Sequence, residues 1–468
     1  MKDLTQSILI FYISCLFLAV FGGTQAYAKS KTFTPQQVNQ DFDVLYQSLI
    51  DTHYNPFAYI SEADFRTKYL SIKAKLNKPE FTLLETTTLF QQLTAAIKNG
   101  HTHVQFPVTT YMEYAEAGGS LFPLELAFED GKAYVRANHS NNNQIMIGSE
   151  LLTINGQAID NILANIYPQI SAERHYFANA ILEAFTFPRY YWYAMGPQDS
   201  FDVELKTNGI LTKYSLKAVP VMDGFEAKKD EILGSQPTVK FYGNTAYLNP
   251  GAFSGNEKKY QAFIDSAFAE INAKQSVNLI IDLKNNSGGN DSFSDYMVAY
   301  IADKPFQWSS NFYLRTSARL KKHTKANRDL TNPFWQSAID NKDGEQYLYK
   351  FDDVQPVAED KRYKGNVYVL VNRQSHSQSS VTAAQLQDYG WATIVGEETG
   401  DYPTLYASQF EYALPSTGIV VKISKGYIVR VNGSKKAEGV MPDIRIEDHL
   451  LDKNDEVLKG LLNQLEQL

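Results

Sequence analysis

Cysteine is almost absent from this sequence, because the 468 residues include only Cys15. A chain with one cysteine forms no internal disulfide and offers no cysteine-rich metal site. Positive charge is also in short supply, since 44 lysines and arginines stand against 52 aspartates and glutamates, for a net charge of -8. Without a basic field to hold phosphates, the chain is not expected to bind nucleic acid.

Long hydrophobic runs are equally rare, and the one that stands out is Ile8–Phe21, which contains Cys15. Lys2 precedes this run, and the small-residue stretch Ala26-Tyr27-Ala28 follows it. The layout is typical of a secretory signal peptide and too short for a membrane anchor; a lipid anchor or a buried N-terminal helix are the alternatives. We expect residues 1–28 to be removed, leaving a mature chain with no integral membrane span, in the periplasm or outside the cell.

What the chain does contain is a composition suited to folded domains. Hydrophobic residues make up 44% and charged residues 21%, which excludes a disordered, collagen-like or polytopic membrane protein. Aromatic residues reach 13%, enough to line grooves as well as fill cores. The length suits about two to four domains, and no tandem repeat or low-complexity tract interrupts it.

Residues 29–112 are expected to form a helical N-terminal domain. Apolar side chains recur at helical spacing from Val38 to Ile50 and again from Phe65 to Leu76. A third helix is expected from about Thr82 to Lys98, directly before the motif Gly100-His101-Thr102-His103.

Residues 113–222 change to short strands and turns. The stretch Leu121–Phe128 alternates, Asp130-Gly131 is a hairpin-turn signal, and Ala133–Val135 is the expected return strand. The stretch Gly148–Ile159 contains a tight Asn-Gly turn between apolar strands. These patterns predict a small β module.

Residues 223–450 alternate short apolar strands with amphipathic stretches. Such alternation is typical of an α/β fold with a largely parallel sheet. The expected strands are Ala246–Leu248, Asn278–Leu283, Asn366–Val371 and Ala392–Val395, and the expected helices are Tyr260–Ala273, Ser292–Ile301 and Ser379–Tyr389.

Three other segments complete the predicted architecture. The aromatic-rich stretch Tyr176–Tyr193 is expected to be a helix or a lid. The stretch Gly418–Val431 is expected to be a closing β-hairpin with its turn at Lys425-Gly426. Residues 451–468 are expected to form a C-terminal helix, because leucine and valine recur there at helical spacing.

The first candidate site follows the expected strand Asn278–Leu283. The chain there runs through a polar turn that contains Gly288 and Gly289 and then enters a helix. Adjacent glycines let backbone N–H groups point at an anion or a developing oxyanion without obstruction by a Cβ atom. A flexible connection between a strand and a helix is the alternative interpretation.

The second candidate site is a cluster of serines at Ser375, Ser377, Ser379 and Ser380, between a strand and a helix N-terminus. A hydroxyl at that place faces the positive end of the helix dipole and free backbone donors, which favours a nucleophile. Helix capping is the alternative, because serine is preferred at caps.

The third candidate site is the pair His101 and His103. Residues that alternate on a strand point the same way, so the pair suggests a metal site, a general base or an ordinary polar strand. No His-Glu-x-x-His or other carboxylate–histidine spacing accompanies them. We therefore expect neither a metal nor a cofactor.

Taken together, these segments resemble the tail-specific or C-terminal processing serine peptidases and their tricorn-core relatives. The order of features is shared: N-terminal helices, a PDZ-like module with Gly119–Phe122 and Gly148–Ile159 as its loop and strand pair, and a catalytic core. The resemblance implies a ClpP/crotonase-like α/β core and a module that binds extended peptide at a sheet edge. The core motifs that carry it are Ile281–Gly289, Leu386–Gly390, Ile394–Gly400 and Glu438–Ile444.

One branch of this family pairs its serine with a lysine 25 positions later, but here that position is Tyr402, and the next lysines are Lys422 and Lys425. The tricorn-core branch instead uses histidine, serine and glutamate, and these map onto His101, Ser377 and Glu438. The resemblance therefore implies a Ser-His-Glu triad acting on peptide or protein substrates.

In such a triad Ser377 is the nucleophile, His101 the general base and Glu438 the residue that orients the imidazole. Gly288 or Gly289, together with the N–H of Gln378, would form the oxyanion hole. His103 is the reserve base. His376 is less favoured, because neighbours on an extended segment point apart. A histidine base of ordinary pKa predicts that activity falls below about pH 6 to 7.

Two other functions fit parts of the pattern. A catalytically silent protein of the same fold would hold peptides or a hydrophobic ligand, and a fluorophosphonate probe would not label it. A glycan-processing protein would need paired carboxylates in a cleft, for which Asp282 and Glu397-Glu398 are candidates.

Overall fold

The computed structural model describes residues 31–223, 225 and 236–467. The predicted signal peptide lies outside the described residues. Within them, no helix has the length and apolar character to cross a membrane.

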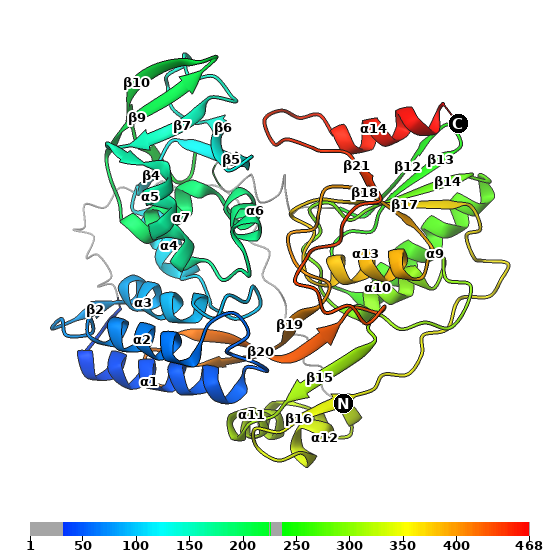
Figure 1. Cartoon of the computed structure of the whole chain (residues 1–468), viewed down its shortest axis with the longest axis horizontal. Helices are drawn as coiled ribbons and strands as arrows, with labels where there is room; N and C mark the ends of the chain where they lie inside the picture. The colour runs from blue at the N-terminus through cyan, green and yellow to red at the C-terminus, as the bar shows by residue number, and fades with distance from the viewer. Residues whose placement is uncertain (1–30, 224, 226–235, 468) are drawn as a thin grey trace, which may run out of the picture.

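The chain forms a mixed α/β structure with several sheets. The N-terminal helices and the β module stack on one side, and a sheet flanked by helices lies on the other (Figure 1). Strands β19 (Leu405–Ala413) and β20 (Val420–Val429) run between the two sides (Figure 1).

The N-terminal part is helical, as expected. The capping box at Thr34 starts the first helix, and Pro35 occupies its first turn. The apolar faces pack into one core that includes Phe42, Phe65 and Phe90. The elements are β1 (Thr32–Phe33), α1 (Pro35–Thr52), α2 (Glu62–Lys73), β2 (Phe81–Thr82), α3 (Leu83–Ala95), β3 (His103–Val104) and α4 (Val108–Glu116).

The next part is a strand-rich module built around an antiparallel sheet with the order β10-β9-β7-β6-β5. The aromatic stretch forms helices α6 and α7, and Phe187 and Tyr191 are buried in the core of the module. Its aromatic residues therefore act mainly as core. The elements are β4 (Ser120–Leu121), β5 (Leu124–Glu129), β6 (Lys132–Asn138), β7 (Glu150–Ile154), β8 (Gln157–Ala158), α5 (Ile159–Ile166), the 3₁₀ turn η1 (Tyr167–Gln169), α6 (His175–Phe185), α7 (Phe187–Met195), β9 (Ser200–Thr207), β10 (Ile210–Lys217) and β11 (Val219–Pro220).

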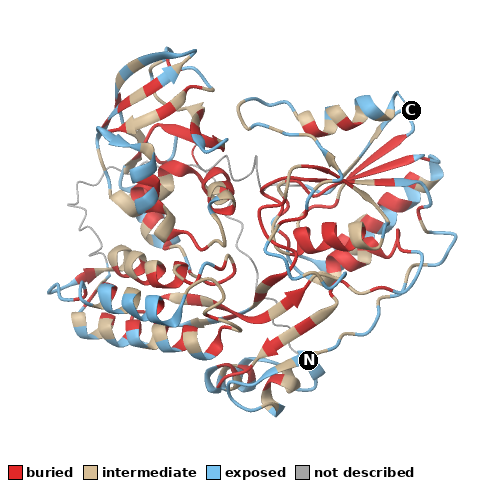
Figure 2. Ribbon diagram, in the orientation of Figure 1, coloured by how far each residue is buried: buried red, intermediate tan, exposed pale blue. Residues whose placement is uncertain are grey.

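The main sheet has the order β12-β13-β14-β17-β18-β21 and is parallel except for its edge strand β12. The expected largely parallel sheet is thus present. Its central strands β13, β14, β17 and β18 are mostly buried, whereas the edge strands β12 and β21 and the outer faces of the helices are more exposed (Figure 2). The elements are β12 (Thr238–Tyr242), β13 (Thr245–Asn249), α9 (Glu257–Ala273), β14 (Asn278–Asp282), α10 (Asp291–Val298), β17 (Asn366–Val371), α13 (Gln378–Asp388), β18 (Thr393–Gly396), β21 (Ile444–Arg445) and α14 (Glu456–Leu465).

Helices cover the two faces of this sheet. Successive strand residues point to opposite faces, so Ile281 packs under α9, α10 and α13, whereas Ile280 packs under α14. Val457 and Leu461 are the buried face of α14. The expected C-terminal helix is therefore present, and it is the cover of the second face.

A second sheet, β16-β15-β20-β19, joins the core to the N-terminal helices through β3. The predicted hairpin turn at Lys425-Gly426 is wrong, because both residues lie inside the continuous strand β20. Gly426 marks a close approach: a Cβ there would lie 2.9 Å from the Cβ of Ser408. The new elements are β15 (Asn311–Arg315), α11 (Ala318–Asn327), α12 (Pro333–Asp340) and β16 (Gln346–Tyr349).

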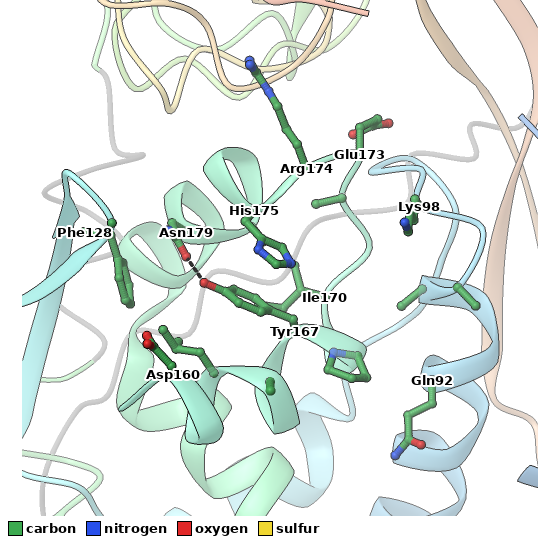
Figure 3. A pocket seen from close by; sticks show the side chains of 18 of the residues that line it. Gln92, Lys98, Phe128, Asp160, Tyr167, Ile170, Glu173, Arg174, His175 and Asn179 are labelled. Carbon is green, nitrogen blue, oxygen red and sulfur yellow. Dashed lines mark hydrogen bonds between the residues drawn. The ribbon is translucent and has the colours of Figure 1, made fainter. Parts of the chain in front are cut away.

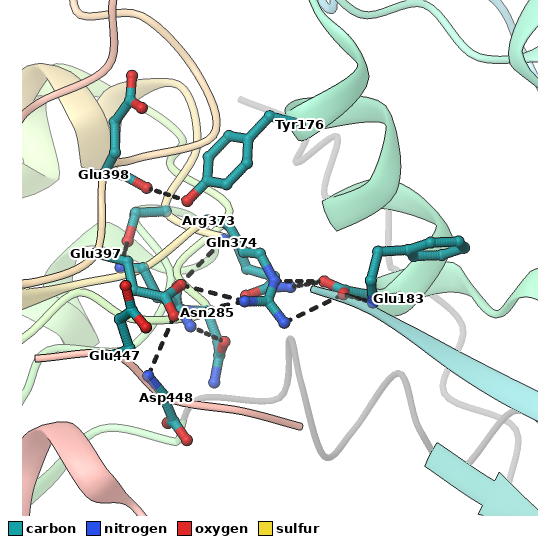
Figure 4. A network of polar contacts seen from close by, with 12 residues as sticks. Tyr176, Glu183, Asn285, Arg373, Gln374, Glu397, Glu398, Glu447 and Asp448 are labelled. Atoms are coloured by element: carbon teal, nitrogen blue, oxygen red, sulfur yellow. Dashed lines mark hydrogen bonds and ion pairs between the residues drawn. The ribbon is translucent and has the colours of Figure 1, made fainter. Parts of the chain in front are cut away.

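A buried polar network ties the module to the core (Figure 4). Arg373, just after β17, contacts Glu183 of α6 through Nε at 2.7 Å and Glu397 through Nη1 at 3.3 Å. Gln374 donates to the same Glu183 carboxylate at 2.7 Å. The side chain of Glu183 is fully buried. The turn that leads to Ser377 is therefore anchored from the module side.

Candidate active site

The candidate residues gather at the carboxyl ends of adjacent parallel strands. Gly288 follows β14, Ser377 follows β17, and Asp401 follows β18. Loops at this edge of a parallel sheet are where α/β proteins place their ligands. His101 reaches the same place from the N-terminal part, between α3 and β3.

Ser377 occupies a strained backbone position at the N-cap of α13, with φ 55° and ψ -126°. A non-glycine residue at positive φ is uncommon and clusters at functional sites. Its hydroxyl makes no capping bond to the helix. By contrast, the hydroxyls of Ser375, Ser379 and Ser380 are buried and donate to backbone carbonyls of Leu283 and Ser375. Helix capping by its hydroxyl therefore does not explain why a serine occupies position 377.

The Oγ of Ser377 lies 2.9 Å from Nε2 of His101, within hydrogen-bond distance. The loop that carries His101 is held by Asn99, whose amide donates to Glu173 and to the carbonyl of Tyr406, each at 3.0 Å. The N–H of Gly100 donates to the same Glu173 carboxylate at 2.9 Å. These bonds fix the histidine against the serine.

Burial governs the protonation of His101. Desolvation lowers its pKa to about 4, and the nearby carboxylate of Asp401 opposes this effect only in part. At neutral pH the imidazole is therefore neutral and able to accept a proton. For a base of this pKa, we expect the loss of activity at a lower pH than the window of about pH 6 to 7 for an ordinary histidine base.

Asp401 is the buried carboxylate of the site, and sequence reasoning missed it. Its Oδ2 accepts the N–H of Ser377 at 3.0 Å and lies 3.9 Å from Nε2 of His101. Its Oδ1 accepts the N–H of Tyr402 at 2.8 Å. The signal that could have pointed to it is its position in the loop after β18, at the carboxyl edge of the parallel sheet.

Glu438 does not reach His101. Its carboxylate lies 3.6 Å from Nζ of Lys436, and 43% of its side chain is exposed. The N–H of Gly439, the residue after Glu438, donates to Oε1 of Glu398 at 2.8 Å. Nδ1 of His101 is buried and has no partner among the described residues. The predicted orienting role of Glu438 is therefore not supported by a contact.

The predicted oxyanion donors differ in availability. The N–H of Gly288 is engaged, because it donates to Oδ1 of Asn286 at 2.8 Å. For the N–H groups of Gly289 and Gln378, no acceptor occurs among the described residues. Gly288 still shapes the site: a Cβ there would lie 2.6 Å from the nitrogen of Gln378 and 2.8 Å from the Cβ of Ser377.

The other histidines occupy different positions. The ring of His376 stacks on that of His101, with centroids 4.8 Å apart, and its Nε2 lies 3.4 Å from Oδ2 of Asp401. The expectation that His376 points away is wrong, because the positive φ of Ser377 breaks the extended geometry on which it rested. His103 pairs with Lys422 in the sheet, and no described interaction joins it to Ser377.

Neither candidate lysine contacts Ser377 in the described structure. Nζ of Lys422 lies 3.4 Å from Oε2 of Glu411. Lys425 is buried and donates to the carbonyl of Ser408 at 3.0 Å and to its Oγ at 2.5 Å. Burial lowers the pKa of Lys425 to about 7. This geometry disfavours a dyad of Ser377 with a lysine.

The carboxylates considered for glycan chemistry are engaged elsewhere. Asp282 accepts the hydroxyl of Tyr247 at 2.7 Å, and Glu397 lies 3.3 Å from Arg373. No described contact joins Asp282 to Glu397. These two candidates therefore do not form the carboxylate pair that glycoside hydrolysis requires.

Two cavities lie near the site. A cavity of about 430 Å³ borders it through Gly100, Ser287 and His376 and continues between apolar side chains such as Phe106 and Phe185. A larger one, of about 1030 Å³, lies between α3 and the module, where Tyr167 donates to Asn179 (Figure 3). Neither Ser377 nor His101 lines the larger cavity.

The sequence is similar to a family of peptidases. The family model described as peptidase family S41 matches residues 244–446. A curated tail-specific protease of Haemophilus influenzae is 37% identical over 95 residues, which are 19% of this chain and 13% of that protein. The chain thus aligns with only a small part of the length of this relative.

Solved structures show a similar fold across nearly the whole chain. The crystal structure of mature CPAF has a TM-score of 0.65 at 15% identity and covers 93% of this chain and 97% of that chain. Mature CPAF complexed with lactacystin has a TM-score of 0.60 at 17% identity, with 92% and 97% covered. At these identities the likeness shows the fold alone.

Proposed function

We propose, from the premise that this chain is a member of peptidase family S41 and hence of a class of serine-type hydrolases, that it cleaves peptide bonds through an acyl-enzyme at Ser377. The observation that carries the proposal is the distance of 2.9 Å between Oγ of Ser377 and Nε2 of His101. A serine hydroxyl is a weak nucleophile unless a base receives its proton, and a neutral buried imidazole is such a base.

In the first half of the reaction, Oγ of Ser377 attacks the carbonyl carbon of the scissile bond while its proton passes to Nε2 of His101. The carbonyl oxygen becomes an oxyanion, for which the N–H groups of Gly289 and Gln378 are the available donors. When the tetrahedral intermediate collapses, the C–N bond breaks and His101 gives its proton to the departing amine.

In the second half, water attacks the acyl carbon and His101 takes a proton from it. The ester bond to Ser377 breaks, the serine recovers its proton from His101, and the carboxylic product leaves. No step requires a metal or a cofactor, so the chemistry is supplied by side chains and backbone donors alone.

The imidazolium formed in each half needs a carboxylate nearby. Asp401, with Oδ2 at 3.9 Å from Nε2 of His101, is the proposed source of that negative charge. The orienting role inferred for Glu438 from the family resemblance stays a prediction. It requires the segment before Gly439 to turn toward the unpartnered Nδ1 of His101.

Substrate handling is assigned to the module. We propose residues 29–112 as a helical domain, 113–222 as a PDZ-like domain that binds extended peptide segments, 223–450 as the catalytic core and 451–468 as a C-terminal helix. An exposed edge strand of an antiparallel sheet can add a peptide strand, and β10 is such an edge. We also propose that the protein is secreted after removal of residues 1–28.

Labelling with a fluorophosphonate probe tests the proposal directly. An active serine hydrolase forms a covalent adduct at Ser377, and Ser377→Ala does not. A catalytically silent peptide-binding protein of the same fold gives no adduct in either case. The module is tested in the intact chain, because Glu173 and Glu183 of this module anchor the active site. An extended peptide that adds to the edge of β10 should slow turnover of long substrates and leave fluorophosphonate labelling of Ser377 unchanged.

A further inference from the structure

Beside the proposed nucleophile lies His376, which the reaction does not use, together with His101 and Asp401, which it does. His101 follows α3, His376 precedes α13, and Asp401 follows β18. One ligand atom from each of these residues lies within 4.8 Å of the others. Segments far apart in the sequence thus bring two imidazoles and one carboxylate to a single point.

The distances suit a small tetrahedral cation. Oδ2 of Asp401 is 3.4 Å from Nε2 of His376 and 3.9 Å from Nε2 of His101. A tetrahedral zinc with bonds of about 2.0–2.1 Å holds its ligands roughly 3.3 Å apart. A metal lies in the plane of each imidazole that it binds, and the rings of His101 and His376 are stacked 17° from parallel. Coordination by both therefore requires one of the two rings to rotate about its side-chain bonds. Oγ of Ser377, at 2.9 Å from His101, or a water would supply the fourth position.

Nε2 of His376 supports the same interpretation. The atom is buried and makes no hydrogen bond to a described residue, although Oδ2 of Asp401 lies 3.4 Å away. A buried polar atom without a partner is costly, and a cation would satisfy it. The proposed catalytic cycle gives this nitrogen no role.

We propose that His101, His376 and Asp401 form an inhibitory binding site for Zn²⁺ or a similar borderline transition-metal ion. Bound metal occupies the lone pair on Nε2 of His101, so the imidazole cannot accept the proton of Ser377. Two imidazoles and one carboxylate favour zinc, copper or nickel over magnesium and calcium, which prefer oxygen ligands. Inhibition rests on the proposed function, but metal binding does not.

The inhibition is measured as the rate of fluorophosphonate labelling against Zn²⁺ concentration, with wild type, His376→Gln and His449→Gln in parallel. His449 belongs to a second group of potential ligands with Asp452 and Glu456, so His449→Gln is the matched control. Wild type and His449→Gln should lose labelling with the same half-inhibitory zinc concentration, and a chelator should restore it. In His376→Gln that concentration should rise at least tenfold, relative to the variant's own zinc-free rate. Mg²⁺ and Ca²⁺ at equal concentration should leave labelling unchanged.

Binding is measured separately on Ser377→Ala with Co²⁺, whose visible absorption is intense in tetrahedral sites. We expect one such band, absent from the double variant Ser377→Ala/His376→Gln and retained in Ser377→Ala/His449→Gln. Equal zinc sensitivity of wild type and His376→Gln, or a Co²⁺ band that survives loss of His376, would overturn the proposal. Because the Co²⁺ experiment needs no catalysis, failure of the metal site is distinguishable from failure of the peptidase proposal.

Discussion

Gly288 offers a sharp test of how the site is built, because it has no room for a side chain. An added Cβ would lie 2.5 Å from the carbonyl oxygen of His376, 2.6 Å from the nitrogen of Gln378 and 2.8 Å from the Cβ of Ser377. Each of these atoms belongs to the backbone or to a Cβ, so none can swing aside. Gly288→Ala must therefore displace the turn that carries both the nucleophile and an oxyanion donor.

An alanine at position 288 has two effects that can be separated, namely backbone strain at a positive φ and crowding by the added Cβ. At φ +80° an alanine is strained by about 1 kcal/mol whatever surrounds it. Gly344 has the same φ of +80°, and apart from its chain neighbours no atom of the described residues lies within 4 Å of the place that an added methyl group would take. Gly344→Ala therefore carries the strain without the crowding. Loss of one well-placed oxyanion donor costs about 10²- to 10³-fold. Gly288→Ala should therefore label with fluorophosphonate at least about 10²-fold more slowly than Gly344→Ala.

The assay compares second-order labelling rates and kcat/KM on a peptide for the two alanine variants and wild type. Circular dichroism and thermal unfolding identify any loss of the folded state. Gly344→Ala should stay within about twofold of wild type. Labelling of folded Gly288→Ala at the wild-type rate would refute the assignment of this turn to the active site.

Four further predictions concern the groups around this turn. Because burial lowers the pKa of His101 to about 4, the base stays neutral as the pH falls, and the labelling rate should be half lost near pH 4, not near 6.5; a midpoint at 6.5 would mean that His101 is not the buried base. Asp401→Asn should lower kcat/KM by about 10²-fold and Glu438→Gln by less than about tenfold, and the reverse order would assign the carboxylate role to Glu438. Arg373→Ala removes the ion-pair partner of the buried Glu183 and should lower the free energy of unfolding in urea by about 3–5 kcal/mol. Arg445→Ala breaks an exposed pair with Glu447 and should lower it by less than about 1 kcal/mol. Equal losses in the two variants would contradict the network in Figure 4. A chelator should leave activity unchanged or raise it, and loss of activity restored by zinc would contradict a serine mechanism.

The sequence pattern is informative where one physical rule governs many residues. Alternation of apolar strands and amphipathic helices predicts the parallel sheet, because burial of both sheet faces demands it. Helical spacing likewise predicts the buried faces of α1 and α2. The pairing of Ser377 with His101 spans 276 positions, and only the family resemblance, not local pattern, brings the two residues together in the prediction.

The wrong or missing predictions share a cause, which is that backbone geometry depends on distant neighbours. Gly426 signals a turn in the sequence, but the glycine is needed because β19 approaches too closely at Ser408. An extended chain would point His376 away from the site, and the positive φ of Ser377 turns it toward His101. Asp401 has no motif of its own, since its role comes from tertiary position alone.

The central claim is that His101 activates Ser377, and the most direct measurement is the site and rate of fluorophosphonate labelling, mapped by mass spectrometry. We expect one adduct, on Ser377, that disappears in Ser377→Ala and forms at least about 10³-fold more slowly in His101→Ala. On a peptide substrate, kcat/KM of the double variant Ser377→Ala/His101→Ala should be no lower than that of Ser377→Ala, because the two residues act as a unit. An adduct on another serine, such as Ser408 beside Lys425, or wild-type labelling in His101→Ala, would contradict the central claim.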